Sequence, residues 1–242
     1  MSSTTWTPTE LLSNSAHFVG KIWRMVEAQH VVSTTKLVST YAEQELLEDI
    51  LEAHKPPVPT EAKDLDYLLF SPFRYDTLSP VGSRFRSPAD PGVFYAAESI
   101  CAAAAEVGYW RWKFLRDTAG LQRLQPCSFT AFRVPIDTNS IDLRLPPLNL
   151  QKALWTDPVN YGATQALARV AREANLGAIL YESVRDPEKH SCVAVLMPQA
   201  FASKKPDSAT QTWMLTVSPE EAVWMRQGGD SFVFPTEHWN TL

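Results

Sequence analysis

Three residue types that could share one reaction lie in a single stretch of this chain. Arg84 is a cation in a loop, Tyr95 is an aromatic residue at the end of a short apolar run, and Glu106 is a carboxylate that follows four alanines. A carboxylate on such an apolar helix costs free energy unless it is paired or has a chemical role. Glu106 is therefore a candidate functional residue, although it could instead pair with Arg74 or Arg111 at a helix edge.

The elements predicted around these residues would bring them together. Residues 71–92 contain four prolines and two glycines, which is typical of a loop held by turns, and binding residues concentrate in such loops. Residues 93–95 predict a short strand, and Ser99 is a suitable N-cap for a helix that runs to about Arg116. The cation, the aromatic residue and the carboxylate would then come from a loop, a strand and a helix that follow one another.

The rest of the chain mixes short strands with a few helices. Further helices are predicted over 41–54, 164–175 (with Gly177 placed to end it) and 219–226, and strands over 128–134, 178–181, 192–196 and 212–217. Residues 22–26 could be a strand or the end of a helix, and residues 135–160 are expected to be irregular. The lack of regular βα alternation favours an α+β fold. We expect a helical elaboration over residues 1–60 packed on a core over residues 61–242, in one compact domain overall.

Several classes of protein are excluded by missing motifs and by charge. The nine glycines form neither GxGxxG nor GxxxxGK[ST], so a Rossmann site or a P-loop is not expected. The five histidines lie far apart, which gives no support for a metal site. The net charge of −5 argues against a nucleic-acid partner, because such proteins present a basic surface.

The location of the protein is predicted from segments that the sequence lacks. The N-terminus has no signal-peptide pattern, and no apolar run reaches the roughly 18 residues of a membrane helix. Three cysteines without a CxxC pair fit a reducing compartment. Cys192 beside His190 could be a thiol nucleophile, but a buried structural cysteine fits the pattern better. We therefore expect a cytoplasmic protein without a membrane partner.

An ordered set of short pieces resembles the RES-domain family, named for its arginine, glutamate and serine. The pieces are Trp23-Arg24, Pro72 to Tyr75, Gly82 to Arg86, Tyr95, Glu106, Tyr181 to Arg185 and Cys192 to Val195. Together they span about residues 22–200. The resemblance implies a core similar to ADP-ribosyltransferases, with short mixed or antiparallel sheets and flanking helices. It also implies the toxin of a bacterial toxin–antitoxin pair, NAD as the substrate without a metal, and an antitoxin that covers the active site.

The resemblance also implies roles for individual residues. The implied catalytic residues are Arg84, Glu106 and Ser183, and the implied NAD-binding residues are Arg24, Arg84, Arg86 and Tyr95. The loop after Arg84 differs from the Asn- and Gly-rich turn expected in the family, so either Arg84 or Arg86 could reach the ligand. Arg185 and Asp186 are interpreted as a turn pair, and Arg185 could also contact phosphate.

The bond between nicotinamide and ribose suits a site with a single carboxylate. Its leaving group is already cationic, so no acid is needed to protonate it, in contrast to ordinary glycosides. Glu106 would stabilise the oxocarbenium charge and bind a ribose hydroxyl, and Tyr95 would stack on nicotinamide. Arg84 and Arg24 would hold the pyrophosphate, for which the guanidinium fork is suited. Ser183 would bind the ribose or orient Glu106.

The group that accepts ADP-ribose is left open by these residues. Water would make the protein a glycohydrolase, inorganic phosphate would make it a phosphorylase, and a protein side chain would make it an ADP-ribosyltransferase. A non-catalytic nucleotide-binding or interaction protein is the alternative from another class. The chain could also form homo-oligomers.

Overall fold

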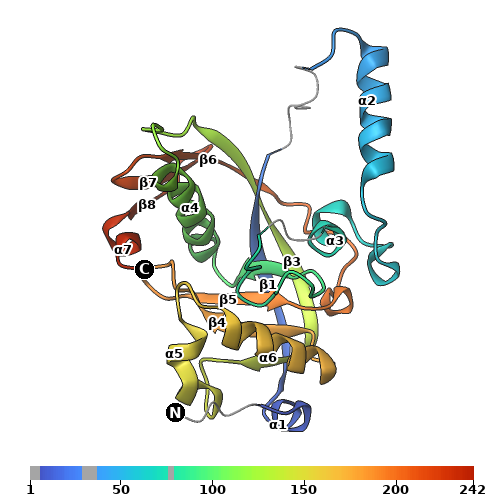
Figure 1. The fold of residues 1–242 in the computed structure, drawn as a ribbon, viewed down its shortest axis with the longest axis vertical. Helices are drawn as coiled ribbons and strands as arrows, with labels where there is room; N and C mark the ends of the chain where they lie inside the picture. Colours follow the sequence, from blue (N-terminus) through green and yellow to red (C-terminus); the bar gives the residue numbers. More distant parts are fainter. Residues whose placement is uncertain (1–5, 29–36, 76–78) are drawn as a thin grey trace.

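A computed structural model of the protein describes residues 6–28, 37–75 and 79–242, which form a mixed sheet flanked by helices (Figure 1). The strands are β1 (Ala16–Glu27), β2 (Phe94–Ala97), β3 (Cys127–Asp142), β4 (Ala178–Glu182), β5 (Ser191–Val195), β6 (Gln211–Val217), β7 (Glu221–Arg226) and β8 (Ser231–Pro235). The α-helices are α1 (Pro8–Ser13), α2 (Tyr41–His54), α3 (Tyr67–Arg74), α4 (Ile100–Asp117), α5 (Lys152–Trp155), α6 (Gly162–Glu173) and α7 (Glu237–Asn240). Three 3-10 helices, η2 (Thr60–Ala62), η3 (Leu148–Gln151) and η4 (Pro198–Ala200), lie in the connections. The predicted α+β class is confirmed.

Five of the strands close into a ring of pairings. The strand order is β1-β2-β5-β4-β3-β6-β7-β8, and β1 also pairs with β3 over its whole length. β3 and β4 are parallel, and the other pairs are antiparallel. The ring is weakest between β1 and β2, which meet only at Trp23 and Ala97. The candidate site lies beside this junction of β1 and β2.

Two apolar clusters occupy the two sides of the ring strands, because side chains alternate along a strand. The smaller cluster takes residues from all five ring strands and none from β6 to β8, including Ile22, Phe94, Phe132, Leu180 and Val195. It therefore fills the space that the ring encloses, and Leu69 of α3 and Phe201 close it. The larger cluster lies on the other side of the strands, under α4 and α6.

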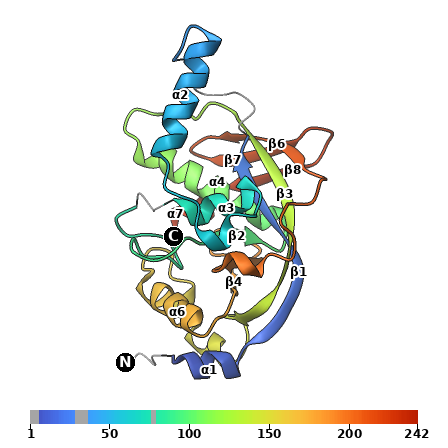
Figure 2. The same ribbon diagram turned by 90° about the vertical axis from the view of Figure 1, so that its right-hand side faces the viewer.

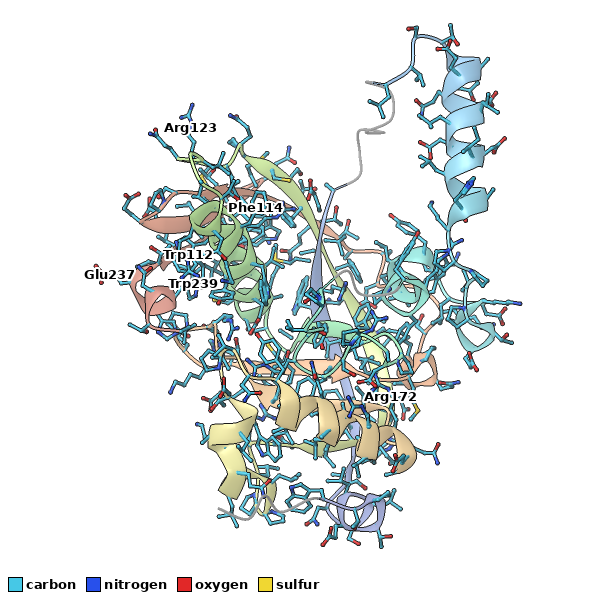
Figure 3. The ribbon with its side chains drawn as sticks, viewed as in Figure 1. Trp112, Phe114, Arg123, Arg172, Glu237 and Trp239 are labelled. Atoms are coloured by element: carbon cyan, nitrogen blue, oxygen red, sulfur yellow. The ribbon has the colours of Figure 1, made fainter. Side chains whose placement is uncertain are left out.

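Helix α4 carries the alanine run into the larger cluster. The side chain of Ser99 caps the helix by accepting the N–H of Ala102, as predicted. Ala102 to Ala105 are all buried, and the short side chains let the helix lie close enough for the Trp224 indole to donate to the Ala104 carbonyl (3.1 Å). Farther along α4, Trp112 packs against Trp239 of α7, and Phe114 lies on another side of the helix (Figure 3). This packing fixes the position of Glu106 relative to the sheet.

The N-terminal part of the chain differs from the predicted helical elaboration. Residues 16–27 form β1, so they belong to the sheet rather than to a helical segment over residues 1–60. Helix α2 is confirmed over 41–54, but no residue of it is buried, and it extends away from the sheet in both views (Figures 1 and 2). It touches the body through Glu52, which pairs with Arg74 at 2.9 Å.

Other predicted elements need correction. Residues 221–226 form strand β7 instead of a helix, because β6 and β8 pair with them on both sides. Strand β3 continues to Asp142, well into the region expected to be irregular. Residues 71–74 complete α3, and residues 76–78 of the predicted loop lie outside the described residues. Helix α6 ends at Glu173, and the left-handed residue after it is Asn175 (φ 53°) rather than Gly177.

Candidate functional site

A cavity of about 300 Å³ opens beside the weak junction of β1 and β2. Glu106, Arg84, Arg24 and Tyr95, which were predicted as site residues, line it. Trp110, Tyr161 and Arg185, which were not among the predicted site residues, line it as well. Its walls therefore come from α4, the strands β1, β2, β4 and β5, the 83–84 turn, the start of α6 and the segment after β4. These elements are far apart in the sequence, and the ring of strands brings them together.

Glu106 faces the cavity from α4 and is held by a neutral partner. The hydroxyl of Ser183 donates to Oε1 of Glu106 at 2.6 Å. The proposed alternative, pairing of Glu106 with Arg74 or Arg111, is wrong, because Arg74 binds Glu52 and Arg111 binds Glu27. Since Ser183 carries no charge, it does not act as a counterion for the Glu106 carboxylate.

Ser183 is fully buried and orients Glu106 from behind. Its oxygen also accepts the backbone N–H of Arg185 (3.2 Å) and of Asp186 (3.1 Å), which closes the turn after β4. The Asp186 carboxylate completes this turn by binding His190 Nδ1 at 2.6 Å. Ser183 is not among the residues that line the cavity. Of its two predicted roles, the geometry favours orientation of Glu106 over contact with the ribose.

Ser183→Ala is expected to damage the site and the fold together. The variant leaves two backbone N–H groups and Glu106 without their hydroxyl partner, so the free energy of unfolding should fall by about 2 kcal/mol. The rate of any reaction that depends on Glu106 should fall as well, by about tenfold, because a misplaced catalytic group loses rate. Urea unfolding and steady-state kinetics measure the two effects. Ser208→Ala, which removes an exposed hydroxyl, serves as the control; equal behaviour of the two variants would contradict the role of Ser183.

Arg84 is displayed by a tight turn that a glycine makes possible. Gly82 has φ +73°, and a Cβ there would lie 2.0 Å from the Arg86 carbonyl oxygen. Ser83 and Arg86 close the turn by two backbone hydrogen bonds (2.7 and 3.1 Å). The guanidinium of Arg84 donates through Nη1 to backbone carbonyls and makes no ion pair within the described residues. Its charge is thus positioned by neutral groups and stays uncompensated.

Arg86 points elsewhere. Its Nε donates to the Asp90 carbonyl at 3.1 Å, and the residue is buried but does not line the cavity. The sequence left open whether Arg84 or Arg86 reaches the ligand. In the structure, Arg84 lines the cavity and Arg86 does not. Arg86 instead holds the loop in which both residues lie.

Tyr95 also stabilises the turn that carries Arg84, a role that was not predicted. Its hydroxyl hydrogen-bonds the Ser83 hydroxyl (2.8 Å) and accepts the Phe85 N–H (3.0 Å), so it fastens the turn that carries Arg84. Burial raises the pKa of Tyr95, which keeps this hydroxyl protonated. The ring still lines the cavity, so stacking on a ligand is compatible with the hydrogen bonds.

Arg24 lies at the edge of the cavity, on the inner side of the strand ring. Its guanidinium lies 4.6 Å from the centre of the Phe94 ring, and Nη1 donates to the Tyr95 carbonyl at 2.6 Å. Burial lowers its pKa to about 10, and Nε is buried without a hydrogen-bond partner among the residues that the structure describes. Arg24 also borders a neighbouring cavity of about 670 Å³ beside α3. Arg24 therefore lies between the two cavities. Only part of it faces the cavity with Glu106, in which it was predicted to hold the pyrophosphate.

Tyr161 is a functional candidate that sequence reasoning did not select, and Arg185 was named there only as a turn residue that could also contact phosphate. Arg185 is not paired with Asp186, since that carboxylate binds His190; its guanidinium instead lies 4.3 Å from the centre of the Tyr109 ring. Tyr161 directly follows the segment 135–160 that was expected to be irregular, and no periodicity marks it as a site residue. The one usable signal was the proximity of Arg185 to Ser183 in the sequence.

The predicted alternative of a thiol nucleophile finds no support in the geometry. Burial and then the neighbouring Glu106 carboxylate raise the pKa of the Cys192 thiol well above its usual value. His190 is engaged by Asp186. Within the described residues, no group of three or more His, Cys, Asp or Glu side chains is placed to hold a metal ion. In the same part of the chain, every helix is too short or too polar to cross a membrane.

The cavity as a whole combines one carboxylate, three guanidinium groups and aromatic walls. Arg24, Arg84 and Arg185 form no ion pairs with carboxylates in the described residues, so the cavity favours an anionic ligand. Glu106 can stabilise a positive charge that develops beside it. The arrangement suits a ligand with phosphate groups and a cationic ring.

Comparisons with known proteins give one family and one named structure. Residues 58–218 match the RES domain family. No curated protein matches the chain. Among the solved structures that match is the crystal structure of the M. tuberculosis MbcT–MbcA toxin–antitoxin complex, with 11% sequence identity, coverage of 96% of each chain and a TM-score of 0.45. The family match includes Arg84, Tyr95, Glu106, Ser183 and Arg185, whereas Arg24 precedes it.

Proposed function

Because the chain belongs to the RES domain family, we propose that it degrades NAD by cleaving the bond between nicotinamide and ribose, as the toxin of a toxin–antitoxin pair. The observation that carries the proposal is the cavity in which, among the described residues, a single carboxylate, Glu106, lies with three guanidinium groups that have no ion-pair partners. The proposal includes an ADP-ribosyltransferase-like fold for the core.

In the proposed reaction, the C1′–N1 bond breaks and its electron pair goes to the nicotinamide nitrogen. Neutral nicotinamide leaves, and the ribose carries the positive charge as an oxocarbenium ion. Glu106 stabilises this charge more strongly in the transition state than in the ground state, which is the condition for catalysis. Ser183 holds the carboxylate in place through the 2.6 Å hydrogen bond. No general acid is required, which agrees with a cavity lined by one carboxylate.

The remaining cavity residues bind the substrate. Arg84 contacts the pyrophosphate, and Arg24 contributes positive charge from the edge of the cavity. The ring of Tyr95 stacks on the cationic nicotinamide. Arg86 acts indirectly, because it holds the loop that carries Arg84.

The acceptor of ADP-ribose is proposed to be water or inorganic phosphate. Water attacks C1′ and loses a proton to give ADP-ribose, and phosphate attacks to give ADP-ribose 1-phosphate. An ADP-ribosyltransferase that modifies a protein shares the same cleavage step and is the alternative. A non-catalytic nucleotide-binding or interaction protein would keep the cavity without turnover. The proposal also includes a cytoplasmic location, an antitoxin partner and the option of a homo-oligomer, without direct binding of nucleic acid.

Incubation of the purified protein with NAD, with and without phosphate, tests this function. Nicotinamide release and the identity of the ribose product are followed by liquid chromatography. Release that needs phosphate identifies a phosphorylase, and release to free ADP-ribose without phosphate identifies a glycohydrolase. No release in either condition contradicts NAD degradation and leaves the transferase and non-catalytic alternatives, which labelled NAD and candidate target proteins separate.

A further inference from the structure

Two of the three cavity arginines are joined through one tyrosine. Tyr161 occupies the N-cap position of α6, without a capping hydrogen bond from its side chain, and lines the cavity. The guanidinium of Arg84 lies over its ring, 4.9 Å from the ring centre, and Nη2 of Arg185 donates to its hydroxyl at 3.0 Å. Tyr161 thus contacts both cations, one through its ring and one through its oxygen.

The segment around Tyr161 holds both arginines with neutral acceptors only. Nη1 of Arg84 donates to the carbonyls of Trp155 (2.8 Å) and Asp157 (3.0 Å), and Nη2 of Arg185 donates to the carbonyl of Pro158 (2.9 Å). The Asp157 carboxylate is turned to its own loop, where it accepts the N–H groups of Val159 and Asn160. Those two hydrogen bonds, with a smaller effect of Arg84, lower the pKa of Asp157, but the side chain forms no ion pair with Arg84.

The position of Tyr161 itself is fixed from both ends. Its hydroxyl donates to the Pro158 carbonyl (3.1 Å), and its own carbonyl accepts the Thr164 hydroxyl (3.0 Å). The same Thr164 hydroxyl binds the carbonyl of Arg84. A rigid aromatic ring between two cations sets their spacing, and neutral acceptors leave both charges available.

A buried guanidinium without a counterion is costly, and the cost falls when an anion arrives. Arg185 is only 2% exposed, and its Nε and Nη1 are buried without hydrogen-bond partners in the described part of the chain. We propose that Tyr161 is a positioning residue that holds Arg84 and Arg185 as a pair, and that this pair supplies the charge for two phosphate groups of the substrate. The inference rests on the proposed function, which it extends from Arg84 to a second cation.

The contribution of a phosphate-binding pair must depend on the number of phosphates in the ligand. NAD, nicotinamide mononucleotide and nicotinamide riboside contain the same bond to nicotinamide but carry two, one and no phosphate groups. Tyr161→Phe keeps the ring under Arg84 and removes both hydrogen bonds of the hydroxyl, the one from Arg185 and the one to the Pro158 carbonyl. Its KM for NAD should rise about fivefold with kcat within about twofold, the size expected for one hydrogen bond. The effect should shrink with nicotinamide mononucleotide and vanish with nicotinamide riboside.

A second set of variants distinguishes positioning of the two arginines by Tyr161 from a nonspecific effect of the substitution on the fold. Tyr161→Leu also removes the ring from Arg84 and should raise the KM for NAD about thirtyfold. In an Arg185→Met background, Tyr161→Phe should add less than about 1.5-fold, since its partner is absent. Tyr41→Phe on the exposed helix α2 is the control for loss of a phenol hydroxyl. An equal effect of Tyr161→Phe on all three substrates, or no effect on any, would overturn the proposal.

Binding of ADP-ribose and of adenosine, measured by calorimetry, makes the same comparison without turnover. If the wild-type protein releases no nicotinamide, NAD degradation fails, yet a selective loss of ADP-ribose affinity in Tyr161→Phe still supports the pair. If the wild-type protein degrades NAD, and Tyr161→Phe neither raises the KM for NAD nor lowers the affinity for ADP-ribose, the proposed role of Tyr161 is wrong. The proposed function then still stands.

Discussion

Replacing Glu106 with glutamine should lower the rate of nicotinamide release by about 10³-fold while NAD binding changes less than about threefold. The substitution keeps the shape of the side chain, and the amide oxygen can still accept the Ser183 hydroxyl. It removes the negative charge that is proposed to stabilise the oxocarbenium ion. Loss of one preorganised electrostatic contact typically lowers the rate 10²- to 10³-fold. Single-turnover kinetics measures the rate, and calorimetry with the inactive variant measures NAD affinity.

The matched control for this prediction is Glu61→Gln, which neutralises an exposed carboxylate outside the cavity. Its rate should equal that of the wild-type protein. Full activity of Glu106→Gln would show that Glu106 is not the catalytic carboxylate. A loss of rate with an equal loss of NAD affinity would instead assign Glu106 to substrate binding.

Arg84→Ala should raise the NAD concentration needed for half-maximal rate by about 100-fold, since hydrogen bonds to charged groups contribute roughly 1.5–3 kcal/mol. Arg84→Lys should raise it about tenfold. Lysine keeps the charge but loses the planar group that lies over Tyr161 and the geometry of the two carbonyl contacts. Steady-state kinetics with NAD measures both values, and urea unfolding establishes that each variant is folded.

Arg86→Ala and Arg123→Ala complete this comparison. Arg123 is exposed and directed away from the sheet (Figure 3), so its removal should change neither stability nor KM. Arg86→Ala should lower the free energy of unfolding, because the residue is buried in the loop, with KM raised less than about threefold. A larger increase in KM for Arg86→Ala than for Arg84→Ala would reverse the assignment of the two arginines.

Local patterns were sufficient for some elements and misleading for others. Helix α4 was predicted because its cap and its apolar spacing are contained in one short stretch. Strand β7 was mistaken for a helix because Glu221–Arg226 contains good helix formers, whereas pairing with β6 and β8 decides its conformation. Strand β1 was not recognised over its full length, because its main partner β3 begins about a hundred residues later and leaves no local signal.

The candidate site shows the same division. Arg84, Tyr95, Glu106 and Ser183 were selected through the resemblance to a family, and the structure brings them to one cavity or to its supporting wall. Tyr161 was missed because a lone tyrosine near prolines is most simply a loop residue. Only the packing of α6 against the turn of Arg84 gives it two cations as neighbours. A site residue whose role depends on such long-range contacts cannot be predicted from the spacing of residues along the sequence.

The closed ring of strands has a consequence for the synthesis of the protein. The walls of the cavity run from Trp23 to Cys192, and within the described residues Glu106 accepts hydrogen bonds from Ser183 and, at 3.9 Å, from the Cys192 thiol. At roughly 5–20 residues per second, a ribosome needs about 10–30 s to extend the chain between these two ends. A partly made chain therefore has no complete cavity. If the chain degrades NAD as proposed, this interval delays the activity until the segment with Cys192 has been made and folded, and a partner made in the same period can reach the chain first.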